Sequence, residues 1–317
     1  SYAIACHISK VTGRPVETLT YDLLVSPELR KETGEITFFS ATDGNHGRGI
    51  AWAANRLGQR AVIMMPKGTE QARFDNIRKE GAVTTIEDLN YDGCVRKAAK
   101  AAADTGGVLV QDTAWEGYEE IPSWIMQGYG TMAAEANSQF KAASGCAPTH
   151  IFVQAGVGSL AAAVTAYFTN AYPNDDIVFV VVEADKADCY YKSVCAGDGS
   201  IRTADGDMNT IMAGLACGEP SLTAWRILSD KASAFVSIPD WAAAIGMRVL
   251  GAPIPGDSRV ISGESGASTA GFLHSLMTDD SLAPLRKAIR INSESRVLLF
   301  STEGDTDPDN YRRIVWD

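Results

Sequence analysis

Several features that would point to a partner are missing from this sequence. No apolar run approaches the roughly 20 residues that a helix needs to cross a bilayer. The net charge is −11, and Lys and Arg form no cluster in the sequence. Nucleic acid and anionic membrane surfaces are therefore poor partners. No signal peptide is recognisable either, and no internal repeat or low-complexity tract is visible.

Cysteine is sparse and dispersed. The six cysteines lie at positions 6, 94, 146, 189, 195 and 217, without a CxxC pair or a Cys/His cluster. We therefore expect no structural zinc or other metal site. Most of these residues are interpreted as reduced thiols of a cytoplasmic protein. Cys189 and Cys217 flank one segment, and both a disulfide and two free thiols are compatible with the sequence.

An initiator methionine is also lacking. Apolar residues recur at helical spacing from Tyr2 to Val11, with no visible cap before them. Helices rarely begin inside a packed core without a cap, so we expect a further segment before Ser1.

What is present is an alternation of short apolar runs and helical patterns. The 317 residues, 45% of them hydrophobic, suit two domains or one large α/β unit. Short strands that alternate with helices of about 10–15 residues indicate a parallel sheet. In the first series the expected strands are 36–39, 61–66, 82–86 and 108–110, and the expected helices are 48–57, 71–80 and 91–105.

A second series follows a long helix predicted at 121–143. Its strands are expected at 150–155, 176–183, 234–238 and 296–300. They are almost wholly apolar, which suits a sheet covered by helices on both faces. Segment 184–225 is expected to be irregular. The break between the two series falls near 121–146.

The turn from Ser40 to Gly47 leads from a strand into a helix. Such a turn collects unpaired backbone N–H groups at a helix N-terminus, which suits a carboxylate or a phosphate. It also carries a carboxylate, an amide and an imidazole, on Asp43, Asn45 and His46. A simple helix cap is the alternative interpretation.

A second turn, from Gly156 to Ser159, also leaves a strand and opens a helix. Two glycines allow close approach of the backbone, and Ser159 adds a hydroxyl, so the turn suits a phosphate. It lacks the third glycine of a dinucleotide fingerprint, because position 161 is alanine. A tight turn with nothing bound is the alternative.

Further polar turns follow other strands. Asp112, like Asp43, follows a strand, so one crevice could hold both carboxylates. Crowded carboxylates raise one another's pKa, which can leave one as a base and the other as an acid. Taken alone, Asp112 is better explained as a turn cap. Segments 262–267 and 301–307 are weaker signals of the same kind.

Taken together, six segments closely resemble the diaminopropionate ammonia-lyase family. These segments are 42–49, 111–118, 154–158, 212–220, 262–266 and 301–307. That family belongs to fold type II of the pyridoxal-phosphate (PLP) enzymes. The resemblance implies two open parallel-sheet α/β domains, with PLP in the crevice between them, and a homodimer. It assigns 1–39 and 131–317 to a large PLP-binding domain and 40–130 to a small α/β domain.

The resemblance also implies roles for individual residues. The cofactor would be held at its 3′-oxygen, its phosphate and its ring nitrogen by Asn45, by Gly156, Val157, Gly158 and Ser159, and by Ser301 or Thr302. The substrate carboxylate would be received by Ser40, Ala41, Thr42 and Asp43. The two catalytic aspartates would be Asp43 and Asp112.

The implied reaction is α,β-elimination of D- and L-2,3-diaminopropionate to pyruvate and two ammonia. Two opposite-handed α-protons require two bases. Asp43 would serve the D-isomer and the Schiff-base lysine the L-isomer, while Asp112 would handle the leaving amine. The family's lysine would lie just before Ser1, and no lysine of this sequence has a matching context. A serine or threonine dehydratase, or a non-catalytic PLP-binding protein that lacks the lysine, are the alternatives.

Overall fold

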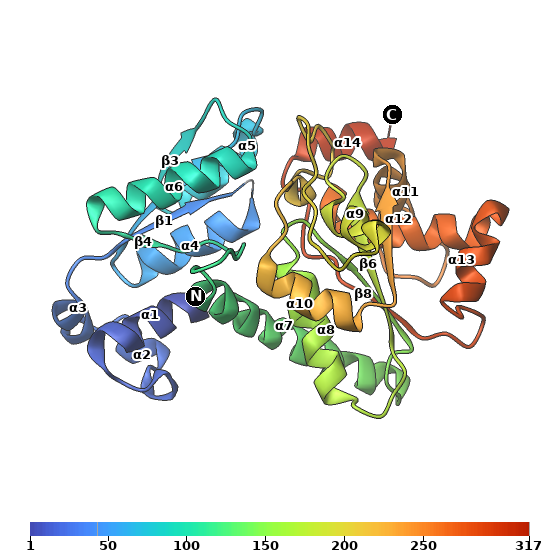
Figure 1. Ribbon diagram of the computed structural model, residues 1–317, viewed down its shortest axis with the longest axis horizontal. Coiled ribbons are helices and arrows are strands. Elements are labelled where there is room, and N and C mark those ends of the chain that lie inside the picture. The colour runs from blue at the N-terminus through green and yellow to red at the C-terminus, as the bar shows by residue number, and fades with distance from the viewer. Residues whose placement is uncertain (43, 317) are drawn as a thin grey trace. The chain divides into compact units, whose positions relative to one another are not determined.

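The computed structural model describes residues 1–42 and 44–316, and the chain forms two compact units, Ser1–Gly128 and Tyr129–Asp317 (Figure 1). Each unit is built on its own parallel four-stranded sheet, as the strand pattern predicted. The long helix α7 (Glu120–Ser144) begins in the first unit and ends in the second. Residues 1–39 fall in the first unit of this division, and their assignment to the large domain stays a prediction.

The first unit begins with helices and continues as an alternating α/β segment. Its strands are β1 (Thr37–Ala41), β2 (Arg60–Met65), β3 (Val83–Ile86) and β4 (Val108–Leu109). Its helices are α1 (Tyr2–Thr12), η1 (Val16–Thr18), α2 (Tyr21–Leu24), α3 (Pro27–Thr33), α4 (Asn45–Arg56), α5 (Gln71–Lys79) and α6 (Tyr91–Thr105). Local signals set several ends: Ser26 caps α3 ahead of a proline at its first position, and Asn90 caps α6.

The strand order of the first sheet is β3-β2-β1-β4. Successive connections move outward from β1 to β3 and then return to the other side of β1. Because parallel crossovers are right-handed, α4 and α5 cover one face and α6 the other. The order reverses between β1 and β4, so the loops that follow these two strands meet at the carboxyl edge, where open α/β sheets bind ligands.

The second unit repeats this plan. Its strands are β5 (His150–Gln154), β6 (Val178–Ala184), β7 (Ala234–Ile238) and β8 (Val297–Leu299), in the order β7-β6-β5-β8. Its further helices are α8 (Ser159–Ala171), α9 (Cys189–Ala196), η2 (Ala213–Leu215), α10 (Leu222–Lys231), α11 (Asp240–Gly251), α12 (Glu264–Thr278), η3 (Asp280–Leu282), α13 (Ala283–Ala288) and α14 (Pro308–Trp316). The reversal here lies between β5 and β8.

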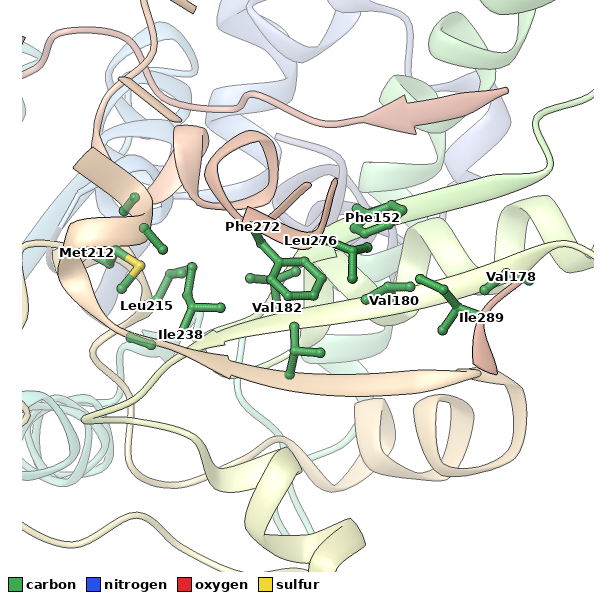
Figure 2. Packing of buried hydrophobic residues seen from close by; sticks show 14 residues of the cluster. Phe152, Val178, Val180, Val182, Met212, Leu215, Ile238, Phe272, Leu276 and Ile289 are labelled. Atoms are coloured by element: carbon green, nitrogen blue, oxygen red, sulfur yellow. The ribbon is translucent and has the colours of Figure 1, made fainter. Parts of the chain in front are cut away.

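A hydrophobic core fills the space between the second sheet and helices α11 and α12 (Figure 2). The even-numbered residues of β6, Val178, Val180 and Val182, point into it, as the two-residue period of a strand requires. Phe272 and Leu276 enter from α12. The odd-numbered side chains of β6 therefore face the opposite side of the sheet, where α9 begins.

Glycine permits an unusually close approach between α11 and α12. A methyl group on Gly271 would lie 2.7 Å from the carbonyl carbon of Ala242 and 2.9 Å from the nitrogen of Gly246. These neighbours are backbone atoms of a packed helix and cannot rotate away. The spacing of the two helices is thus fixed by the absence of side chains at Gly246 and Gly271.

Two expectations from the sequence need correction. Helix α4 begins at Asn45, not at 48, because the turn closes early on the side chain of Thr42. Segment 184–225 is not wholly irregular, since it contains α9, η2 and the first turn of α10. The glycines of this segment lie between the helices and led the sequence reasoning to miss them. Among the described residues, no helix is long and apolar enough to span a membrane.

Candidate active site

The loop after β1 is organised by a single buried hydroxyl. Thr42 Oγ1 accepts hydrogen bonds from the backbone N–H groups of Gly44, at 3.0 Å, and Gly47, at 3.1 Å. Gly47 must lack a side chain, because a methyl group there would lie 2.9 Å from Cβ of Thr42. The loop therefore closes tightly and directs the N-terminus of α4 toward the carboxyl edge of the sheet. That end carries the partial positive charge that favours an anion.

Gln111 joins the loop after β4 to the end of β1. Its side chain is fully buried, and its Oε1 accepts from Ser40 Oγ at 3.0 Å and from the Ala41 N–H at 2.9 Å. Its Nε2 donates to the Ala41 carbonyl at 3.1 Å and lies 2.8 Å from the Tyr91 hydroxyl. The amide thus replaces the strand partner that the two-residue β4 is too short to provide.

Asp112 lies next to Gln111 and is held from two sides. The Tyr91 hydroxyl lies 3.3 Å from its Oδ1, and the Gln111 Nε2 donates to the same oxygen at 3.1 Å. His46 Nδ1 lies 3.8 Å from its Oδ2, while His46 Nε2 donates to the Val110 carbonyl at 2.9 Å. Because Nε2 must carry a proton for that bond, Nδ1 of a neutral His46 is unprotonated, and only the protonated ring forms an ion pair with Asp112.

The predicted residues of the first unit are placed as follows. Ser40, Ala41 and Thr42 are buried, and the Ser40 hydroxyl and the Ala41 N–H are both used by Gln111. Asn45 is exposed in the first turn of α4. Asp112 lies at the adjacent strand end, so the fold brings it close to the loop after β1. The predicted Asp43 lies outside the described residues.

In the second unit the glycine turn forms as predicted. Gly156 leaves β5, and Gly158 adopts the left-handed conformation, with φ of 93°, just before α8. A methyl group on Gly156 would lie 3.1 Å from the Gly214 carbonyl oxygen and 3.2 Å from Cys217 Sγ. Ser159 is buried as the first residue of α8. The turn therefore presents backbone donors at a helix N-terminus, with no side chain to obstruct them.

The loop after β8 adjoins this turn, because β5 and β8 are neighbouring strands. Gln154 Nε2 donates to Thr302 Oγ1 at 3.2 Å, and the Ser301 hydroxyl donates to Ser262 Oγ at 2.7 Å. Glu303 is buried and accepts from the Ser265 N–H at 2.9 Å, at the start of α12. Ser301 and Thr302 are thus held near the glycine turn by side chains of different elements.

Comparisons with known proteins identify the family of this chain. The family of pyridoxal-phosphate dependent enzymes matches residues 14–287. The diaminopropionate ammonia-lyase of Salmonella typhimurium is 48% identical over 317 residues, which are 100% of this chain and 78% of that protein. The Escherichia coli (strain K12) enzyme is 48% identical over 318 residues, with the same coverage. The chain belongs to the diaminopropionate ammonia-lyase family.

Solved structures of the family have the same fold. The E. coli diaminopropionate ammonia-lyase in complex with D-serine superposes with a TM-score of 0.91 at 45% identity, covering 99% of this chain and 77% of that one. The same enzyme with an aminoacrylate-PLP azomethine reaction intermediate gives 0.88 at 46% identity, with the same coverage. A threonine deaminase of Solanum lycopersicum, at 18% identity and a TM-score of 0.70, shares the fold alone; the match covers 99% of this chain and 78% of that one.

The residues present fit the cofactor of this family. The glycine turn places backbone N–H groups at the N-terminus of α8, and neither Gly156 nor Gly158 has room for a side chain. In addition, Gln154 Oε1 is buried and has no hydrogen-bond partner among the residues that the structure describes. An amide with one end on Thr302 and the other unpaired suits a site completed by a polar ligand. By contrast, the described residues include no group of His, Cys, Asp and Glu suited to hold a metal.

One carboxylate of the second unit has a strongly shifted pKa. Glu183, at the end of β6, is fully buried, and burial raises its pKa to about 8. The backbone N–H groups of Tyr190 and Tyr191 donate to its two oxygens at 2.9 and 2.7 Å, which opposes the shift. Cys189 lies beside it, and burial raises the pKa of that thiol. Cys189 and Cys217 are both thiols and form no disulfide, which answers the question that the sequence left open.

Sequence reasoning missed several residues that shape these loops. Gln111 and Gln154 were part of the quoted motifs, but an amide has no charge or nucleophile to mark it as important. Tyr91 is the first residue of a helix, and from the sequence it would be interpreted as a packing residue. Tyr190 and Glu183 lie in or beside the segment expected to be irregular. A buried glutamate at the end of the most apolar strand was the one available signal.

Proposed function

We propose that this chain is a PLP-dependent carbon–nitrogen lyase that converts D- and L-2,3-diaminopropionate to pyruvate and two ammonia. The observation that carries the proposal is the 48% identity to diaminopropionate ammonia-lyases across the whole chain. When bound, PLP supplies the electron sink that allows the α-proton and the β-amino group to leave. The protein's contribution is binding, orientation and proton handling.

The second unit would hold the cofactor. Gly156, Val157, Gly158 and Ser159 supply backbone and hydroxyl donors at the N-terminus of α8, which suit a dianionic phosphate. Ser301 or Thr302 would contact the ring nitrogen, and the bond from Gln154 to Thr302 favours Thr302 as the better-held group. A neutral hydroxyl there leaves the ring nitrogen without a carboxylate partner.

The first unit would bind the amino acid. The N-terminus of α4 would favour the substrate carboxylate, and the family resemblance assigns Asn45 to the 3′-oxygen of the cofactor. Ser40 and Ala41 already serve Gln111, and Thr42 already bonds to Gly44, Gly47 and Met64. The first turn of α4 is therefore the stronger candidate for the substrate carboxylate. Asp43 remains our candidate base for the D-isomer, with the family's lysine as the base for the L-isomer.

Asp112 is the best-supported acid–base group of this chain. Its carboxyl is partly buried, with 15% of the side chain exposed, and is oriented by Tyr91, Gln111 and His46. A carboxyl that is held in place and still reachable can protonate or position the leaving β-amine.

A dehydratase acting on serine or threonine is the second candidate. A threonine dehydratase of Salmonella typhimurium is 31% identical, but over 174 residues that make up 54% of this chain. A dehydratase needs a proton donor for the leaving hydroxyl but no space for a charged β-ammonium group. A carboxyl held by three polar side chains can pair with such an ammonium group, which favours diaminopropionate as the substrate. A PLP-binding protein without catalysis is the third candidate.

The test measures pyruvate release by the full-length protein with PLP, using D- and L-2,3-diaminopropionate and L-serine in parallel. We expect both isomers of diaminopropionate to be turned over faster than serine. Asp112→Asn should lower kcat by about 10²–10⁴-fold, whereas Asp104→Asn, on the exposed side of α6, should not. Faster turnover of serine would reject the proposal in favour of a dehydratase, and no pyruvate from any substrate would favour the binding protein.

We further propose that the protein works in the cytoplasm as a homodimer. All six cysteines are thiols outside any disulfide, which is what a reducing compartment maintains. The dimer is an expectation from the family. Light scattering on the full-length protein tests it, and a monomeric mass would reject it.

A further inference from the structure

Tyr190 lies against the glycine turn from within the core of the second unit. It is the second residue of α9 and fully buried, and its ring packs between Trp225 and Phe235, with ring centroids 6.1 and 6.4 Å away. Its hydroxyl donates to the Val157 carbonyl at 2.6 Å. The ring also occupies the space beside Gly158, where a methyl group would lie 2.5 Å from Tyr190 Cζ.

The Val157 carbonyl receives a second hydrogen bond. The Ser221 N–H donates to it at 2.9 Å. Two donors on one carbonyl oxygen use both of its lone pairs and fix the direction in which it points. No described peptide bond is cis, and in a trans peptide the C=O and the following N–H point in opposite directions. The Gly158 N–H is therefore directed away from Tyr190.

We propose that Tyr190 is a positioning residue for the cofactor phosphate. By holding the Val157 carbonyl, it keeps the Gly158 N–H aimed at the place where an anion would bind. This rests on the cofactor assignment in the proposed function, and it assigns a role to a residue that does not itself touch the ligand. Glycine restricts its own φ and ψ less than other residues do, so the hydrogen bonds to the Val157 carbonyl help to fix the orientation of this peptide.

Tyr190 is itself fixed at its backbone. Its N–H donates to Glu183 Oε1 at 2.9 Å, and the next N–H, of Tyr191, donates to Glu183 Oε2 at 2.7 Å. Both donors belong to the first turn of α9, where N–H groups lack helical partners. Glu183 of β6 thus fixes the start of α9, and α9 in turn places the Tyr190 side chain against the Val157 carbonyl of the turn. The chain of contacts runs through buried groups of one unit.

The test compares the binding of PLP with that of pyridoxal, which lacks the phosphate. Tyr190→Phe removes one hydroxyl and leaves the ring packing intact. Tyr191→Phe is the matched control, because it removes a hydroxyl from the neighbouring, exposed side chain of the same helix. Each full-length protein is stripped of cofactor and titrated, with binding followed by quenching of tryptophan fluorescence. The ³¹P NMR shift of bound PLP is recorded as a second readout.

We expect Tyr190→Phe to raise the Kd for PLP by roughly three- to tenfold, the effect of one lost hydrogen bond. The Kd for pyridoxal should not change, and the ³¹P resonance should shift. Tyr191→Phe should match the wild type in both Kd values and in the ³¹P shift. An equal rise in the Kd for PLP and for pyridoxal, or no rise in either, would overturn the proposal, because it predicts that only phosphate-dependent affinity is lost.

A second variant covers the case in which Tyr190→Phe does not fold. Ser221→Pro removes the other donor to the Val157 carbonyl, and the Ser221 φ of −69° suits proline. It should weaken PLP selectively as well, and an unchanged ratio of PLP to pyridoxal affinity would count against the proposal. Phosphate-selective loss in a protein that does not turn over diaminopropionate would support this inference and reject the proposed function.

Discussion

Gly158→Ala is the substitution that most directly tests the geometry of the glycine turn. Gly158 has φ of 93°, and a methyl group there would overlap the Tyr190 hydroxyl and lie 2.5 Å from Cζ and 2.7 Å from Cε2 of its ring. The ring cannot retreat, because Tyr190 is fully buried between other aromatic side chains. Either the turn or α9 must therefore move.

Two terms set the magnitude. An L-residue in the left-handed conformation costs about 1–2 kcal/mol, and overpacking a filled core costs about 1–3 kcal/mol more. We expect Gly158→Ala to lower the free energy of unfolding by roughly 2–5 kcal/mol. Gly197 is the matched control in the same unit: its φ is 68°, but nothing lies within 4 Å of its Cβ position. Gly197→Ala should therefore cost about 1–2 kcal/mol, the conformational term alone.

The assay is urea unfolding of the three proteins, together with PLP titration. The Gly158 variant should lose more stability than the Gly197 variant and should bind PLP more weakly, because its turn can no longer direct the Gly158 N–H. The Gly197 variant should bind PLP as the wild type does. Equal destabilisation by the two substitutions, with PLP affinity retained in both, would refute the contact between Tyr190 and the turn.

The remaining predictions concern stability. Gly271→Ala should lower the free energy of unfolding by about 3 kcal/mol, because its methyl group would meet the backbone of Ala242. Gly130→Ala in α7 is the control: nothing lies within 4 Å of its Cβ position, so it should be neutral or slightly stabilising. Equal urea midpoints for the two variants would contradict the close packing of α11 and α12. Glu183 has its pKa raised to about 8 by burial, so the native state holds its proton more tightly than the unfolded chain does. Its contribution to stability is complete below the ordinary pKa of 4.5, declines as the pH rises above that value, and is gone above about 8. Urea unfolding as a function of pH should show a smaller decline for Glu183→Gln than for the wild type, and parallel curves would show that the shift is absent.

The carboxyl edges of the two sheets illustrate how far local sequence information reaches. The strands, the glycine turn and the loop after β4 were predicted because each depends on neighbouring residues: an apolar run, two glycines, a polar break. The early start of α4 was missed because it depends on Thr42, whose hydroxyl bonds to residues two and five positions later. Helix α9 was missed because its cap is the side chain of Glu183, a residue of the preceding strand.

The sequence by itself determined two parallel α/β units, the turns that follow their strands, and a set of motifs long enough to indicate an ammonia-lyase. These features arise from periodicity and from glycine, whose effects are local. Only the tertiary structure decided which groups hold those turns in place. Gln111 reaches β1 across 70 positions of sequence, and Tyr190 reaches Val157 across 33. Partners so far apart are brought together by packing, and a single sequence contains no local pattern that records their distance.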